Sequence, residues 1–322
     1  TGSDTFVRPS MGAWVSYGLG TENENLPSFI TINPTLGHGG VGNWSSAFLP
    51  AVHQGTVVES AANKPPIADL FPSEKQGDDG PGRDFLKQLN ARHASARAAD
   101  TRLAARMASY ELAARLQLSA PEAVAIDGET AATRSLYALG DDDIGPFGRQ
   151  CLLARRLVER GVRFVQIFCG AENTSALKIR PNWDSHEDIV RDHGYWGRVL
   201  DRGASALLAD LKSRGLLDST LVICATEFGR QPFLQGGNKG RDHNPGAFTA
   251  WMAGGGIKGG VSHGTSDPFG FQAEENPAYS YDLHATALHL LGIDHEQLAF
   301  YHNGIKRRLT DVHGRVISEI VA

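Results

Sequence analysis

The stretch Ser219-Thr220-Leu221-Val222-Ile223-Cys224-Ala225-Thr226-Glu227-Phe228-Gly229-Arg230 decides the expected fold. Its apolar run over residues 219–225 predicts a buried strand, and Glu227 follows directly. The segment Gly240-Arg241-Asp242-His243 lies in the next loop. Open α/β sheets gather their functional groups at the carboxyl ends of strands, so we expect acid and imidazole groups to meet there. Such groups can bind a divalent metal, which can polarise a phosphate or sulfate ester.

Outward from this stretch, helical and apolar extended segments alternate. Strands are predicted at 26–32, 55–59, 162–168 and 247–253, and helices at 147–160, about 189–214 and 283–291. Such alternation is typical of an α/β protein with a largely parallel central sheet covered by helices on both faces. We therefore predict a three-layer α/β/α sandwich.

One segment departs from this alternation. Residues 82–117 are rich in Ala, Arg and Leu, with apolar residues mostly three or four positions apart, which predicts one or two long amphipathic helices. The 322 residues can bury one large core or two modest ones. We expect a single domain over 1–322 with a helical insertion at about 82–117.

Composition excludes some classes of function. The formal charge of −5 provides no electrostatic basis for binding nucleic acid or an anionic membrane. No apolar run reaches the roughly 18 residues of a membrane span. Cys151, Cys169 and Cys224 are far apart in apolar stretches, which favours buried thiols over disulfides.

Several segments carry candidate metal ligands. Asp184 and His186 lie in the loop after the predicted strand at 162–168, Glu227 follows the strand at 219–225, and His243 lies in the loop beyond. Mixed oxygen and nitrogen ligands favour zinc, manganese or iron, with calcium as a further candidate ion. The alternative for Asp184 is a helix cap, and for Asp242 a turn cap.

Two arginines flank these acids. Arg230 and Arg241 are candidates for a bidentate contact to phosphate or sulfate, and we group Asp242 with them as a substrate-binding residue. The alternative is that the arginines form salt bridges to Glu227 or Asp242.

Other motifs have less context. Gly260-Val261-Ser262-His263-Gly264 matches a nucleophile elbow but lacks the flanking strand and helix. Residues 37–42 match G-x-G-x-x-G, yet no helix is expected to open there. His284 and His289 lie on a short predicted helix and are interpreted as core or surface residues.

A set of longer segments resembles a known family. The segments are Arg8–Trp14, Leu153–Val165, Trp183–His186, Glu227–Arg230, Gly240–His243, Asp282–Thr286 and Leu309–Gly314. Together they resemble the bacterial sulfatase-like family catalogued as domain of unknown function number 1501, which looks like a branch of the alkaline phosphatase superfamily.

The resemblance implies an alkaline-phosphatase-type sandwich and a metal-dependent hydrolase of sulfate or phosphate esters, periplasmic or secreted. Its substrate would be a small sulfated or phosphorylated molecule, including a glycan. By the family pattern Asp184 and His186 resemble the first metal pair, Glu227 the later acid and His243 the late histidine. Phe228 departs from the pattern, because many relatives place a histidine there.

The resemblance also implies that the nucleophile and the first metal acid lie upstream of Thr1-Gly2. We therefore expect weak or no turnover from this chain, and a homodimer that covers the surface left by the missing first strand. The alternative function is a non-catalytic binding module built on a degenerate hydrolase fold.

Overall fold

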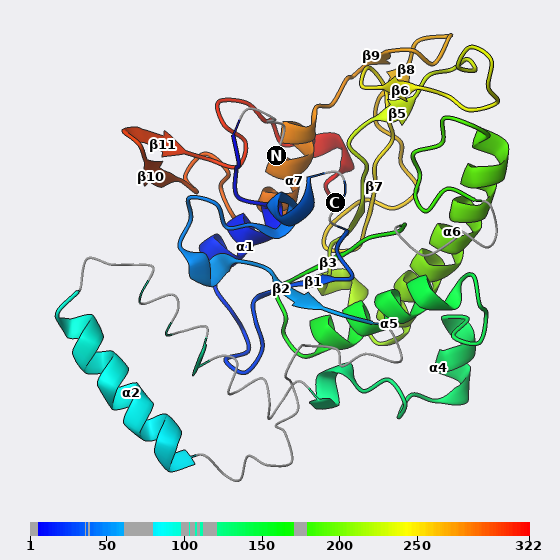
Figure 1. Ribbon diagram of the computed structural model, residues 1–322. Helices are drawn as coiled ribbons and strands as arrows, with labels where there is room; N and C mark the ends of the chain where they lie inside the picture. The colour runs from blue at the N-terminus through cyan, green and yellow to red at the C-terminus, as the bar shows by residue number, and fades with distance from the viewer. Residues whose placement is uncertain are drawn as a thin grey trace. The chain divides into compact units, whose positions relative to one another are not determined.

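The chain forms two compact units in a computed structural model (Figure 1). The larger unit comprises Thr1–Gly2, Glu129–Arg155 and Phe168–Ala322, and the smaller comprises Ser3–Gly128 and Arg156–Ile167. The structure describes residues 6–35, 37, 39–60, 80–97, 103, 107, 110–111, 121–170 and 179–322.

The smaller unit contains a parallel three-stranded sheet. Strand β1 (Phe29–Ile32) lies between β2 (Thr56–Val58) and β3 (Phe164–Ile167), in the order β2-β1-β3. All four residues of β1 are buried, as expected for the central strand of a sheet covered on both sides. The predicted strands at 26–32, 55–59 and 162–168, and their parallel arrangement, are confirmed.

Helix α1 (Met11–Leu19) packs on this sheet. Ser10 caps it by accepting a hydrogen bond from the Ala13 N–H at 3.3 Å. Gly12 lies against the rings of Phe29 and Phe164, where a β-carbon would come within 2.6 Å of Phe29. Only glycine permits that approach of helix to sheet.

The remaining helical segments of the smaller unit are short or partly described. The 3₁₀ turns are Gly40–Trp44 and Ala51–His53, and helix α2 runs over Gly80–Ser95. Helix α2 confirms the first part of the helical region predicted over 82–117, most of whose remainder lies outside the described residues.

The larger unit carries four described α-helices. They are α4 (Ala131–Leu136), α5 (Gly145–Glu159, whose last residues belong to the smaller unit), α6 (Ile189–Ser213) and α7 (Ser280–Leu290). Helices α5 and α6 pack closely, because Gly203 of α6 lies against Phe147 and Cys151 of α5. The helices predicted at 147–160, 189–214 and 283–291 are confirmed within a few residues. Among the described residues, Cys151, Cys169 and Cys224 form no disulfide, and Cys151 is buried.

The described strands of the larger unit form antiparallel pairs. They are β4 (Val222–Cys224) with β7 (Trp251–Ala253), β5 (Gly229–Arg230) with β6 (His243–Asn244), β8 (Thr265–Ser266) with β9 (Ala273–Glu275), and β10 (Phe300–His302) with β11 (Ile305–Arg307). A parallel pair needs a crossover connection, usually a helix, and the chain between β4 and β7 contains none. The predicted parallel order therefore holds for β2-β1-β3 and not for β4 and β7.

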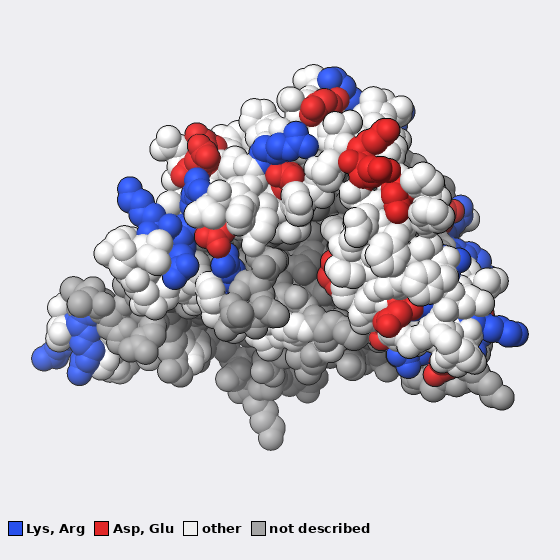
Figure 2. Space-filling model, turned by 90° about the horizontal axis from the view of Figure 1, so that it is seen from above, with Lys and Arg blue, Asp and Glu red and all other residues white. Residues whose placement is uncertain are grey.

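The surface and helices show two further features. Lys and Arg side chains are interspersed with Asp and Glu on the face drawn in Figure 2. Within the described part of the chain, no helix combines the length and apolarity that a bilayer crossing requires.

Candidate metal centre

Asp184, His186 and His243 converge in the larger unit, and we refer to them as the triad. Oδ1 of Asp184 lies 2.9 Å from Nε2 of His186 and 2.9 Å from Nε2 of His243. The two histidine nitrogens are 3.2 Å apart. One carboxylate oxygen and two imidazole nitrogens thus form a nearly equilateral triangle. Among the described residues, this is the one group of three or more potential ligands that meet so closely.

These separations fit a shared metal ion. Zinc binds histidine nitrogen and carboxylate oxygen at about 2.0–2.2 Å, and adjacent ligands at that distance lie roughly 2.8–3.1 Å apart in octahedral geometry and roughly 3.3–3.6 Å apart in tetrahedral geometry. The observed separations of 2.9, 2.9 and 3.2 Å lie within the span of these two ranges. The donor set is one that zinc, manganese and iron accept.

The hydrogen bond of His186 to Gln235 gives a second reason to expect a cation. Its Nδ1 is 2.9 Å from Oε1 of Gln235, an acceptor, so this bond assigns the donor role to Nδ1. In that tautomer Nε2 carries a lone pair, which faces the carboxylate oxygen of Asp184. Two acceptors at this distance repel unless a proton or a metal lies between them. Gln235 bonds the other nitrogen of the His186 ring and so fixes its orientation, as outer-shell residues do for metal-bound histidines.

Two neighbouring stretches of chain hold the triad together. Backbone hydrogen bonds run from Ile189 to Lys239, from Lys239 to Glu187 and from Arg241 to Ser185, at 3.1, 3.0 and 3.2 Å. These bonds place the loop of Asp184 and His186 alongside the residues before His243. His243 itself lies on β6, opposite Arg230 of β5.

The Asp184 carboxylate is the electrostatic centre of the site. Oδ1 accepts a hydrogen bond from Nη2 of Arg230 at 2.8 Å, and Oδ2 accepts one from Arg180 at 3.3 Å. Burial alone would raise the pKa of Asp184, but the hydrogen bonds from Arg230 and His243 and the nearby charges lower it well below its usual value. The carboxylate is therefore ionised and ready to act as a ligand at neutral pH.

A further histidine lies next to the triad without joining it. Nε2 of His193 is 2.8 Å from the carbonyl oxygen of Trp183, and the two rings pack edge to face. Burial lowers the pKa of His193, and the charges of Arg230 and Arg241 act in the same direction. His193 therefore supports the ligand loop as a neutral ring.

The structure places the predicted site residues in different roles. Glu227 is not a member of the triad: its Oε2 accepts a hydrogen bond from Oγ1 of Thr226 at 3.0 Å, and both residues are exposed. Instead, the ring of Phe228 stacks on His243 at a centroid distance of 4.1 Å. The residue that follows Glu227 thus lies directly against a candidate ligand.

The two predicted arginines also differ. Arg230 donates to Asp184 and to the carbonyl oxygens of Trp183 and Arg241, so its guanidinium holds the loops of the site. Among the residues that the structure describes, no hydrogen bond or ion pair engages the guanidinium of Arg241, and its Nε is buried. Asp242 is exposed, and its Oδ1 accepts the His243 N–H at 2.8 Å.

The sequence interpretation missed the residues that support the ligands. Asp192 is fully buried on α6, and its Oδ2 accepts the Ser185 hydroxyl at 2.7 Å, between the two loop ligands. Gln235 and Arg180 contact His186 and Asp184 in the same way. These are ordinary polar residues at no recognisable spacing, so their roles depend on the tertiary fold.

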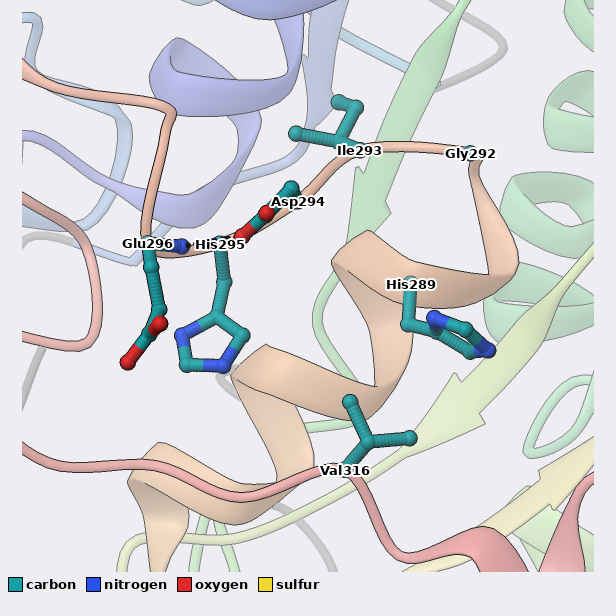
Figure 3. A pocket seen from close by; sticks show the side chains of 7 residues that line it. All are labelled: His289, Gly292, Ile293, Asp294, His295, Glu296 and Val316. Atoms are coloured by element: carbon teal, nitrogen blue, oxygen red, sulfur yellow. Dashed lines mark hydrogen bonds between the residues drawn. The ribbon is translucent and has the colours of Figure 1, made fainter.

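A separate cavity of about 440 Å³ lies at the end of α7 (Figure 3). Its lining residues are His289, Gly292, Ile293, Asp294, His295, Glu296 and Val316. The polar groups there are engaged locally: Asp294 accepts the Glu296 N–H at 2.8 Å, and His295 bonds Thr310 at 3.0 Å. They form no cluster of three ligands like the triad.

The two glycine-containing motifs lack the structural context of a nucleophile elbow or a dinucleotide site. Residues 260–264 are flanked by neither the strand nor the helix that a nucleophile elbow needs. Residues 40–44 form a 3₁₀ turn in place of the helix of a dinucleotide site, and Leu36 and His38 lie outside the described residues.

Comparison with known families gives one match. Residues 1–321 match the model of a family described as "Protein of unknown function (DUF1501)". No curated protein and no solved structure matches the chain.

Proposed function

This chain belongs to the DUF1501 family, whose description states no activity, and from its triad we propose that it is a divalent-metal-dependent hydrolase of sulfate or phosphate esters. The convergence of Oδ1 of Asp184 with Nε2 of His186 and Nε2 of His243 carries the proposal. A divalent ion held by these atoms would act as a Lewis acid toward a non-bridging oxygen of the ester.

The arginines support an anionic substrate. Arg241 has a guanidinium without an ion-pair partner among the described residues, and it lies two positions from the ligand His243. A planar guanidinium matches the paired oxygens of sulfate and phosphate. Arg230 keeps Asp184 ionised and oriented through the 2.8 Å bond to Oδ1. In this proposal Arg241 binds the ester oxygens, Arg230 orients the ligand, and Asp242 lies at the edge of the site.

In this arrangement Ser185 supports the ligand loop and is not the nucleophile. It lies between Asp184 and His186 in the sequence, but its side chain is fully buried and its hydroxyl donates to Asp192. A buried hydroxyl that is committed as a donor cannot reach the sulfur or phosphorus of a substrate.

The proposal also includes the fold, the location and the substrates that the family resemblance implies. They are the alkaline-phosphatase-type α/β/α sandwich, a periplasmic or secreted location, and small sulfated or phosphorylated substrates. The parallel β2-β1-β3 sheet supports an α/β fold of this kind.

Metal analysis combined with ester hydrolysis tests the proposal. The full chain is freed of metal, incubated separately with zinc, manganese, iron(II) and calcium, and analysed for bound metal and for hydrolysis of sulfate and phosphate esters. We expect about one ion per chain, lost in Asp184→Asn and His243→Gln but kept in His289→Gln, whose histidine is exposed on α7. Metal binding without hydrolysis of any ester would support the non-catalytic binding module instead.

A further inference from the structure

Exposed apolar side chains occur along residues 233–271, the same part of the larger unit that carries His243, and the proposed metal chemistry uses none of them. They are Phe233 (58% exposed), Leu234 (54%), Phe248 (37%), Phe269 (80%) and Phe271 (37%). Single exposed apolar residues are common, whereas exposed apolar side chains that contact one another are typical of a binding surface.

Two of these residues form a defined surface, which we call the aromatic shelf: Phe233 and Phe271. Their rings stack with centroids 6.3 Å apart and planes inclined by 13°. Phe233 comes from the loop after β5, and Phe271 from the loop between β8 and β9. Each ring restricts the other, so the shelf is formed before any ligand arrives.

Hydrogen bonds connect both halves of the shelf to the triad. Phe233 is two residues before Gln235, whose Oε1 lies 2.9 Å from Nδ1 of His186. The carbonyl oxygen of Phe271 accepts a hydrogen bond from Asn244 at 3.0 Å, and Asn244 directly follows His243. Asn244 is 2% exposed, so this connection is rigid. Each half of the shelf is thus connected to a histidine ligand through one neighbouring residue, Gln235 for His186 and Asn244 for His243.

The Phe271 backbone is fixed on its other side as well. Its N–H donates to Oδ1 of Asp267 at 2.6 Å. The Ala273 N–H donates to the carbonyl oxygen of Gly246 at 2.8 Å, which joins the β8–β9 hairpin to the residues after β6. In Figure 1 these short strands lie side by side at the same end of the larger unit as β5 and β6.

We propose that the aromatic shelf binds an aromatic ring on the alcohol side of the ester, so that the substrates are aryl esters of sulfuric or phosphoric acid. The inference rests on the proposed function, because the triad and Arg241 would hold the anionic end of the same molecule. Phenylalanine rings offer apolar faces and no hydrogen bonds to sugar hydroxyls. The shelf therefore favours a flat apolar group over a glycan.

Binding of two non-hydrolysable ligands tests the shelf separately from catalysis. Titration calorimetry on the full chain, loaded with the metal it retains best, compares 2-naphthylmethylphosphonate with methylphosphonate. We expect the naphthyl ligand to bind at least about tenfold more tightly. Phe233→Ala and Phe271→Ala should each weaken naphthyl binding roughly 3- to 10-fold, with metal content and methylphosphonate affinity unchanged. Tyr301→Ala, at an aromatic residue 69% exposed on β10, is the matched control and should change neither affinity.

Each alternative result has a distinct meaning. Equal affinity of the wild type for the two phosphonates, or naphthyl binding that survives both phenylalanine substitutions, overturns the shelf whatever the hydrolysis assay gives. Shelf-dependent naphthyl binding without hydrolysis of any ester supports the shelf and favours the non-catalytic binding module over the proposed hydrolase. Sedimentation of the same variants completes the test, because a wild-type dimer that dissociates in Phe233→Ala would show the shelf to be a contact between copies.

Discussion

The α-carbon of Gly240 lies directly against the backbone of His186, so that a β-carbon at position 240 would overlap the carbonyl group of His186. The two residues are brought together by the hydrogen bonds that join the ligand loop to the segment before His243. The close approach explains why a glycine stands where the two ligand-bearing stretches meet. It also means that the spacing of the triad depends on a residue with no side chain.

Replacing Gly240 should open the triad. Gly240→Ala must push the two stretches apart, and we expect unfolding free energy to fall by about 1–3 kcal/mol. Metal affinity, measured by competition with a chelator, should fall by roughly tenfold or more, since ligand spacing sets affinity. Gly236→Ala is the control, because a β-carbon there meets nothing within 4 Å. Equal metal affinity in both variants would show that the approach at Gly240 does not set the triad's spacing.

Asp192 should act on the metal site through Ser185. Burial raises the pKa of Asp192, but hydrogen bonds from Arg191 and Ser185 lower it overall, so a buried carboxylate anchors the ligand loop. Asp192→Asn and Ser185→Ala should each weaken metal binding about 10- to 100-fold. The visible spectrum of the cobalt(II)-substituted protein should shift, which a loss of stability alone would not cause.

The matched control for Asp192 is Asp188. It caps the same helix by accepting the Arg191 N–H at 3.1 Å, and asparagine is an equally good cap. Asp188→Asn changes the charge near the start of α6 without touching Ser185, so it should leave the cobalt spectrum unchanged. A normal spectrum in Asp192→Asn would remove Asp192 from the site.

The parts of the fold that the sequence predicted are those set by local pattern. The strand at 29–32 and the helix at 189–213 were predicted from the spacing of apolar residues, which can be read from a short stretch of sequence. The pairing of β4 with β7 was missed, because an apolar run does not reveal the direction of its partner. Direction depends on the connection, and the residues between these strands form a loop and short ribbons in place of a crossover helix.

In the candidate site, too, local sequence identified some residues, while tertiary packing decided the position of others. Asp184 and His186 are two residues apart in one loop, and His243 follows a glycine-arginine-aspartate segment, so residue type and spacing identified all three. Glu227 shows the limit of that method. Neighbouring side chains on an extended segment point to opposite sides, and the ring that contacts His243 belongs to Phe228. Which of two adjacent residues faces a site is decided by packing.

The buried ion pair between α5 and α6 should dominate the stability of the larger unit. Asp210 Oδ2 lies 2.9 Å from Nε of Arg155 and accepts the Tyr137 hydroxyl at 3.0 Å. Arg155 is 1% exposed. Asp210→Ala removes the carboxylate that pairs with both Arg155 and Arg214, while Glu129 still lies 2.7 Å from Nη2 of Arg155. We therefore expect a loss of about 3 kcal/mol in chemical denaturation, at the lower end of what breaking a buried ion pair costs. Tyr137→Phe removes one hydrogen bond and should cost about 1 kcal/mol. Similar small losses in both would contradict a central role for the ion pair.

His284 should make the protein sensitive to mild acid. Burial lowers its pKa in the folded state to about 4, from 6.5, and among the described residues its Nδ1 has no hydrogen-bond partner. Between these two values the unfolded chain takes up a proton that the folded protein does not, so stability falls as pH decreases through this window. The loss is about 1.4 kcal/mol per pH unit, or about 3 kcal/mol in all. Above pH 6.5 the ring is neutral in both states and contributes no slope.

Urea denaturation at a series of pH values isolates this contribution. Carboxyl groups also titrate in mild acid, so the informative quantity is the difference between wild type and His284→Gln, whose side chain does not titrate. The stability of the variant should depend less on pH between 6.5 and 4, and the two curves should run parallel above 6.5. His289→Gln, at the exposed histidine of the same helix, should follow the wild-type curve. Parallel curves for wild type and His284→Gln across the whole range would show that His284 gains its proton as readily in the folded protein as in the unfolded chain.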